Sequence, residues 1–195
     1  MIAGTSLFKY LFICRHGEAE PLTLPPGMKS ANDITRADWQ RKLTSAGRDQ
    51  IAKAASHCFD MIERNHIDFN KLVIVHSPLL RAEQSAAELS QVLEQRFVDP
   101  IHLLSERCLR SRHFTPEQSV DIAIKILEEE VESCDVVPIV VTHQPFASKW
   151  VEYLCSLSLH ASDSIHFGTA SIALIAFNKS SPDFADLLAI NHSYS

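Results

Sequence analysis

The sequence predicts an α/β fold, a three-layer α/β/α sandwich with a mainly parallel central sheet. Short apolar, β-branched runs recur along the chain, and the segments between them carry apolar residues at helical spacing. Strands that alternate with helices form a parallel sheet through right-handed crossovers, with helices on both faces. Because 195 residues suit one domain with a substantial core, we expect a single domain over residues 1–195.

The first half of the chain predicts two strands, a helix and a long loop. Residues 7–14 are apolar, aromatic-rich and too short for an ordinary helix, which indicates a central strand. Residues 19–41 hold three prolines and a glycine without apolar periodicity, so we expect a loop insertion with at most a helical turn near Ala37. A helix capped by Ser45 should run over about residues 45–65, before a strand at 71–77.

The second half continues the alternation. Ser77-Pro78 is a suitable start for a helix to about Phe97, because serine caps helices and proline favours the first helical position. Thr115-Pro116-Glu117-Gln118 matches a capping box and should open a helix to about residue 133. The other expected elements are an extended piece at 101–104, strands at 136–142, 171–177 and 187–191, and a helix at 145–157.

Composition argues against several classes of protein. The net charge of −6 gives no basic stripe for a phosphate backbone, so we expect no nucleic-acid partner. Five scattered cysteines without CxxC spacing predict neither a disulfide framework nor a thiolate zinc site, and they fit a reducing cytoplasm. We expect no membrane association, because the start lacks secretion-signal features and no apolar run reaches about 20 residues. The histidines lack HExxH spacing, so neither a metal nor another cofactor is expected.

Polar residues of one kind follow three of the predicted strands. The three stretches are "FICRHG" at 12–17, "VIVHSPLLRAEQ" at 73–84 and "IVVTHQP" at 139–145. Ligands of such sheets bind beyond the carboxyl ends of the parallel strands, so Arg15, His16, Arg81 and His143 should converge at one edge. Two guanidiniums and two imidazoles surround a volume suited to a phosphoryl group.

Each of these residues has an expected role. His16 would attack phosphorus as a neutral imidazole and carry the group as phosphohistidine, and Arg15 and Arg81 would bind the equatorial oxygens. His143 would donate a second hydrogen bond to the transferring oxygens. Gly17 would let the backbone turn closely around the bound anion. Fixed cations and donors are sufficient for phosphoryl transfer without a metal.

Four motifs carry a resemblance to a known family. "RHGEAE", "LTSAGRDQ", "SPLLRAEQSA" and "VTHQP", in that order and spacing, resemble the histidine phosphatase superfamily, also called phosphoglycerate mutase-like. Within it, the short chain and the "THQPF" and "FGTASIALIAF" stretches are most similar to bacterial phosphohistidine phosphatases of the SixA type. The resemblance covers residues 10–177. It implies a phosphorylated His16, phosphate binding by Arg15 and Arg81, and a pocket completed by His143.

The substrate is open to more than one interpretation. Protein phosphohistidine, carried by a histidine-phosphotransfer domain, is the expected substrate, since its leaving nitrogen departs as neutral imidazole with little acid assistance. Small phosphate esters are the alternative, and they need a general acid. Glu106 lies where mutase-like relatives have their acid, and a solvated surface carboxylate is the competing interpretation. A third interpretation is a phosphate-recognising scaffold without turnover.

Further residues are candidates with competing interpretations. Gln144 and Ser77 are candidate phosphate contacts, although capping a helix explains Ser77 equally well. His76 more simply ends its strand. The insertion at residues 21–41 is either a lid or docking edge for a phosphorylated protein, or a plain surface excursion. The sequence gives no indication of the oligomeric state.

Overall fold

The fold is built on one six-stranded mixed sheet in the order β3-β2-β4-β1-β5-β6. The computed structural model describes residues 9–24, 26–27, 30–97, 100–109, 115–130, 135–155, 165–177 and 185–192. The strands are β1 (Tyr10–Arg15), β2 (Lys71–His76), β3 (His102–Ser105), β4 (Val136–Thr142), β5 (Ile172–Phe177) and β6 (Ala185–Asn191). Strands β1 to β4 run parallel, while β5 and β6 pair in antiparallel fashion.

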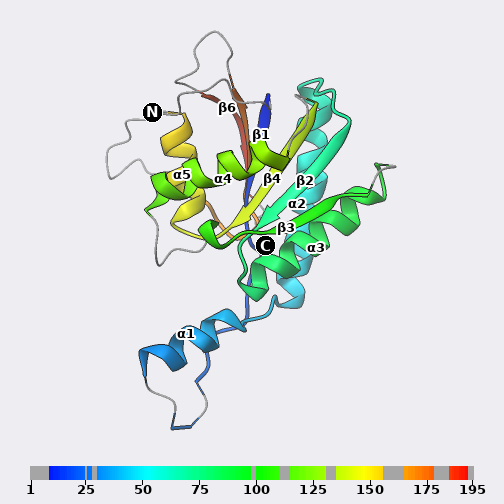
Figure 1. Cartoon of the computed structure of the whole chain (residues 1–195). Coiled ribbons are helices and arrows are strands. Elements are labelled where there is room, and N and C mark those ends of the chain that lie inside the picture. Colours follow the sequence, from blue (N-terminus) through cyan, green and yellow to red (C-terminus); the bar gives the residue numbers. More distant parts are fainter. Residues whose placement is uncertain are drawn as a thin grey trace.

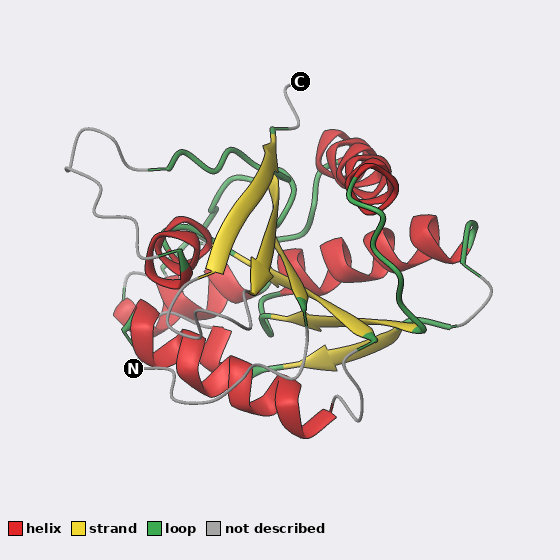
Figure 2. Ribbon diagram, turned by 90° about the horizontal axis from the view of Figure 1, so that it is seen from above, coloured by secondary structure: helices red, strands yellow, loops and turns green. Residues whose placement is uncertain are grey.

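Helices cover both faces of this sheet (Figure 1). The helices are α1 (Ala31–Trp39), α2 (Ser45–Arg64), α3 (Leu80–Glu94), α4 (Pro116–Glu130) and α5 (Phe146–Leu154), with a 3-10 turn at Arg107–Leu109. Helices α2 to α5 form the two covering layers. Figure 2 shows the sheet between two layers of helix. The three-layer α/β/α prediction is therefore confirmed.

Each face of the sheet has its own hydrophobic core. On one face, Leu11 and Ile13 of β1 pack with α4 and α5 around the fully buried Trp150. On the other face, Phe12 and Cys14 of the same strand pack with α2 and α3. Successive side chains of a strand point to opposite faces, and an apolar run without polar alternation therefore suits a strand that is covered on both sides.

The insertion at residues 19–41 is not a plain loop. Residues Ala31–Trp39 form helix α1, where we expected at most one helical turn. Ser30 caps α1: its hydroxyl accepts from the N–H of Asp33, whose carboxylate accepts from the N–H of Ser30. This capping box stabilises a helix that buries none of its residues. Figure 1 shows α1 projecting away from the sheet and its covering helices.

Two other helix starts differ from expectation, and one agrees. The N-cap of α2 is Thr44, whose hydroxyl accepts from the N–H of Gly47, and not Ser45. Helix α3 begins at Leu80 and not at Pro78, so Ser77 is not its N-cap residue. The predicted capping box at the start of α4 is confirmed by bonds between Thr115 and Gln118 at 3.0 and 3.3 Å.

The predicted strands agree with the structure to within a few residues, apart from positions 7 and 8, which lie outside the described residues. The expected helix ends near residues 133 and 157 also lie outside the described residues. Among the described helices, none is both long and apolar enough to span a bilayer.

Candidate active site

Hydrogen bonds from three directions fix the backbone at the carboxyl end of β1. Arg15 is level with Thr142 of β4, and the N–H of His16 donates to the Thr142 carbonyl at 2.9 Å. The His16 carbonyl accepts from Ala170, and the Arg15 N–H donates to Ser171. The turn before β5 and the end of β4 therefore hold His16 rigidly at the edge of the sheet.

The hydrogen bonds of His16 define its tautomer. Its Nδ1 lies 2.7 Å from the Gly17 carbonyl, which can only accept, so Nδ1 carries the proton and Nε2 keeps its lone pair. The Nε of Arg81 donates to Nε2 at 3.2 Å. Burial, and to a smaller extent the charges of Arg81 and Arg15, lower the pKa of His16 to about 3. His16 is thus a neutral imidazole at neutral pH.

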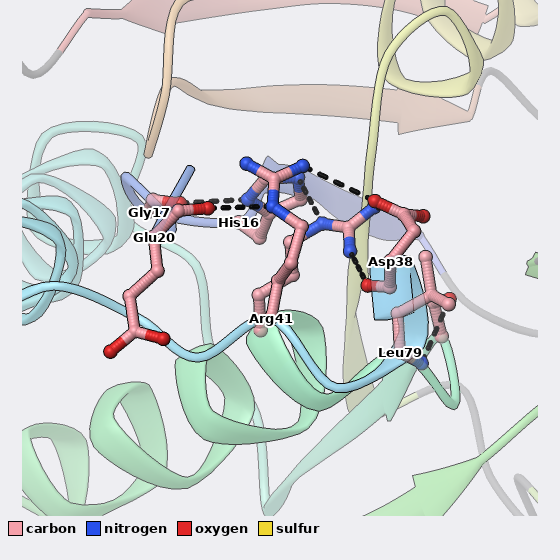
Figure 3. Close-up of polar contacts among 8 residues, drawn as sticks. His16, Gly17, Glu20, Asp38, Arg41 and Leu79 are labelled. Carbon is pink, nitrogen blue, oxygen red and sulfur yellow. Dashed lines mark hydrogen bonds and ion pairs between the residues drawn. The ribbon is translucent and has the colours of Figure 1, made fainter. Parts of the chain in front are cut away.

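Arg81 reaches His16 from the first turn of α3. It is 6% exposed, and burial lowers the pKa of its guanidinium while the carboxylate of Asp38 opposes that shift. Nη1 of Arg81 donates to the Asp38 carbonyl at 2.8 Å, and Nη2 lies 3.3 Å from Asp38 Oδ2. Figure 3 shows these contacts linking His16 and Asp38.

Arg15 supplies the second cation of the site. Its Nη1 donates to the Phe167 carbonyl at 2.7 Å, and its Nε is buried without a partner among the described residues. Burial and the nearby charge of Arg81 lower the pKa of Arg15. Two guanidiniums therefore lie close enough to repel one another, and an anion between them would relieve that repulsion.

His143 follows β4 directly and is 6% exposed. Its Nδ1 is buried with no hydrogen-bond partner in the described part of the chain. Burial, followed by the charge of Arg81, lowers its pKa to about 4. An unpaired buried nitrogen is costly in a folded protein, and a ligand oxygen that accepted from it would remove that cost.

The four side chains expected to converge are thus brought together. His16 interacts electrostatically with Arg15, Arg81 and His143. The result is a buried site with two cations and two neutral imidazoles, in which one nitrogen of Arg15 and one of His143 have no hydrogen-bond partner among the described residues. Chemically, such a site suits a tetrahedral oxyanion placed within reach of the His16 lone pair.

Other predicted site residues have structural partners. The N–H of Gly17 donates to Ser85, and a Cβ at position 17 would collide with the Gly47 backbone in the first turn of α2. Close packing against α2 is therefore sufficient by itself to require glycine at this position, and the expected turn around an anion stays a prediction. The Gln144 amide donates to Ser148 at 2.7 Å and to the Phe167 carbonyl at 3.1 Å, so it holds the same carbonyl as Arg15.

Three residues lie near the ends of β2 and β3. His76 Nδ1 bonds the Ser77 carbonyl at 3.0 Å, which repeats the arrangement of His16 with Gly17. The Ser77 hydroxyl is fully buried and accepts from the Leu79 N–H at 3.5 Å (Figure 3). The Glu106 N–H donates to the His76 carbonyl at 2.9 Å, which places Glu106 at the carboxyl edge of the sheet.

Asp38 and Arg41 were not predicted as site residues. The Asp38 carboxylate contacts two arginines, Arg81 at 3.3 Å and Arg41 at 3.2 Å. Arg41 also donates through Nε to the Glu20 carbonyl at 2.6 Å. Both residues belong to the 19–41 insertion, in which no motif points to them. The signal available in the sequence was Ser30-x-x-Asp33, which marks a helix start and so places Asp38 in its last turn.

A groove of about 360 Å³ adjoins the site on the Arg15 side. Gln144, Lys149, Ile165 and His166 are among its lining residues. Its mixture of charged and apolar side chains continues the site toward the surface. Within the described residues, no group of three or more His, Cys, Asp or Glu side chains is placed to hold a metal ion.

Comparison with solved structures identifies the fold. No family model and no curated protein sequence matches the chain. Among solved structures, the protein histidine phosphatase SixA complexed with tungstate matches with a TM-score of 0.60 at 21% identity, over 94% of this chain and 97% of that one. The chain has the histidine phosphatase fold.

Two further structures share this histidine phosphatase fold. Native mycobacterial glucosyl-3-phosphoglycerate phosphatase has a TM-score of 0.62 at 15% identity, over 95% of this chain and 100% of that one. The same enzyme with inorganic phosphate has a TM-score of 0.61 at 14% identity, over 96% and 98%. At these identities the likeness concerns the fold, and the chemistry depends on the residues described above.

Proposed function

We propose that this protein is a phosphatase that transfers a phosphoryl group to His16 and then hydrolyses the phosphohistidine. The observation that carries the proposal is the convergence of a neutral His16 with two arginines and His143, where Arg15 Nε and His143 Nδ1 are buried without a partner in the described part of the chain. An oxyanion would satisfy both nitrogens and offset both cations. The histidine phosphatase fold supports the same chemistry.

The reaction follows from the geometry in two displacements. His16 Nε2 forms a bond to phosphorus, and the bond from phosphorus to the leaving atom breaks with its electron pair on that atom. A water oxygen then bonds to phosphorus, the Nε2 bond breaks with its pair returning to His16, and the water proton ends on the released phosphate. Arg15, Arg81 and His143 stabilise the oxygens throughout, which is the main contribution a protein makes to phosphoryl transfer.

We propose a protein phosphohistidine, on a histidine-phosphotransfer domain, as the preferred substrate. An imidazole leaves readily as the neutral ring when its other nitrogen is protonated, so no strong acid is required. Two observations support the proposal: a groove of about 360 Å³ continues from Arg15, and SixA shares the fold. We place the reaction in a reducing cytoplasm, which would preserve the free thiols of Cys14, Cys58, Cys108 and Cys155.

A label-trapping experiment tests the covalent intermediate. Wild-type protein mixed with a phosphorylated histidine-phosphotransfer domain should acquire acid-labile label, and His16→Ala should acquire none and lose turnover by a factor of roughly 10³ or more. His76→Ala is the matched control, because His76 is equally buried and also bonds the next carbonyl through Nδ1. Equal labelling of wild type and His16→Ala would remove His16 from the nucleophile role, and no labelling or turnover in wild type would favour a scaffold.

Turnover of small phosphate esters is the second candidate function. The position of Glu106 at the carboxyl edge, bonded through its N–H to the His76 carbonyl, favours it. A carboxylic acid there could protonate an alkoxide leaving group. A panel of sugar phosphates assayed beside the phosphorylated domain separates the two: brisk ester turnover without dephosphorylation of the protein would support the ester activity and exclude the proposed substrate.

A further inference from the structure

The Asp38 carboxylate lies where an anionic substrate would meet Arg81. Nη1 of Arg81 donates to the Asp38 carbonyl at 2.8 Å and Nη2 to its carboxylate at 3.3 Å, while Nε is held by His16 at 3.2 Å. A phosphoryl group bound by a guanidinium takes two neighbouring N–H donors of the same fork. Asp38 therefore uses donors that a phosphate would need.

Helix stability does not explain an aspartate at this position. Asp38 belongs to the last turn of α1, where the helix dipole disfavours negative charge. The Asp38 side chain is 34% exposed, so packing in the interior does not explain an aspartate at this position either. What Asp38 does have is an arginine on each carboxylate oxygen, Arg41 on Oδ1 and Arg81 on Oδ2. Its placement is thus explained by the cations of the site.

The neck of the insertion is fixed independently of this contact. Ala19 pairs with Leu43, and the Glu20 N–H donates to the Lys42 carbonyl at 2.8 Å. Arg41 is held at the neck by the Glu20 carbonyl (Figure 3). Beyond the neck, α1 buries none of its residues, so little packing opposes a movement of Asp38 away from Arg81.

We propose that Asp38 is a resident competitor for the phosphate-binding face of Arg81 and must be displaced when a phosphoryl substrate binds. The inference rests on the proposed function of Arg81 as a phosphate ligand. Displacement exchanges one anion for another at Arg81, and Asp38 keeps Arg41 as its partner, so no buried charge is left unpaired. As Arg81 turns to phosphate, its Nε also leaves His16 and frees the nucleophilic lone pair.

Competition of this kind determines specificity. An anion that offers only phosphate contacts, such as the inorganic phosphate product, has to displace Asp38 with no other binding energy. A phosphorylated protein that also fills the groove beside Arg15 has additional contacts with which to do so. Asp38 therefore selects against small phosphates and favours release of the product.

Direct binding of inorganic phosphate, measured by titration calorimetry, tests the proposal. Asp38→Asn should bind phosphate roughly tenfold or more tightly than wild type, because a charged competitor is lost, and Asp38→Ala should do so at least as well. Glu20→Gln is the matched control. It removes the same charge from the same insertion, at an exposed side chain that Figure 3 shows directed away from Asp38, and it should leave the affinity close to that of wild type.

The outcomes separate this inference from the proposed function. Unchanged or weaker phosphate binding by Asp38→Asn, or no binding by any variant, would overturn the competitor role. An equal gain in Glu20→Gln would overturn it too, since general electrostatics would then explain the effect. Turnover is measured on the same preparations. If the wild type is active and Asp38→Asn binds phosphate no more tightly, the inference alone is rejected. If the wild type is inactive and Asp38→Asn does bind phosphate more tightly, the proposed function alone is rejected.

Discussion

The proposed chemistry depends on the position of a single proton of His16. The Gly17 carbonyl holds that proton on Nδ1, so the lone pair on Nε2 faces Arg81 and the site beyond it. With its pKa lowered to about 3, the imidazole is already neutral at neutral pH, as the proposed attack on phosphorus requires. A free histidine, with an ordinary value of 6.5, would be partly protonated in mildly acidic solution.

Glu106 provides a residue-scale prediction that distinguishes the two substrates. Glu106→Gln keeps the size of the side chain but removes its proton-donating ability, so ester turnover should fall by roughly 10²–10⁴-fold if Glu106 is the acid. Turnover of a phosphorylated histidine-phosphotransfer domain should stay within about threefold, since its leaving imidazole needs no comparable assistance.

Steady-state rates of the Glu106→Gln variant on both substrates provide the measurement. Glu129→Gln, which changes an exposed carboxylate on α4, is the control and should alter neither rate. Ester turnover that survives in Glu106→Gln would show that Glu106 is a surface carboxylate.

At the scale of single elements, the sequence predicted most of what packs. Strands β1, β2, β4 and β5 and helices α2 and α4 bury one or two apolar faces, and it is this burial that produces the apolar pattern from which they were predicted. Helix α1 has no fully buried residue, so it leaves no clear apolar pattern, and its capping box is the feature that marks it. Asp38 was missed for the same reason. It lies on this helix and not at the end of a strand, so no motif in the sequence points to it.

The strand-end rule predicted the other four site residues for a physical reason. In parallel strands the carboxyl ends lie at one edge, and the register that sets Arg15 level with Thr142 and His76 level with Val141 is an expression of that rule. The hydrogen bonds within the site could not be predicted, because they depend on side-chain packing and not on the spacing of residues along the sequence. The bonds of Gly17 to Ser85 and of Gln144 to Phe167 are examples.

The cap of α1 gives a prediction at the scale of an element. Ser30→Ala removes the hydroxyl that accepts from the Asp33 N–H, so α1 should lose roughly 1 kcal/mol of helix stability. Hydrogen exchange of the α1 amides should accelerate several-fold, while the melting temperature of the protein stays within about 1 °C, because α1 adds nothing to the core.

Thr44→Ala is the matched substitution at the N-cap of α2. Helix α2 packs into the core through Ile51 and Cys58, so loss of its cap should lower the melting temperature of the whole protein by several degrees. Equal losses of melting temperature in the two variants would mean that α1 is integral to the fold.

At the scale of the whole molecule, the site sets a limit on stability in acid. The unfolded chain can protonate His16 and His143 below about pH 6.5, whereas the folded protein keeps them neutral down to about pH 3 and pH 4. In that window the unfolded state binds more protons. Stability therefore rises with pH, and acidification removes it.

Urea unfolding between pH 7 and pH 4 measures this linkage. Each histidine contributes a slope of up to about 1.4 kcal/mol per pH unit, reached once the unfolded state is fully protonated and the folded state is not. Near pH 5, the unfolding free energy of His143→Phe should change with pH less steeply than that of the wild type, by about the slope of one histidine. His102→Asn changes an exposed histidine of β3 and should keep the wild-type slope. A bound phosphate anion favours protonated imidazoles, so saturating phosphate should bring the folded-state pKa of both histidines closer to the ordinary value of 6.5 and make the loss of stability on acidification smaller. A wild-type protein whose unfolding free energy is the same at pH 5 and pH 7 would contradict the buried, neutral state of these two histidines.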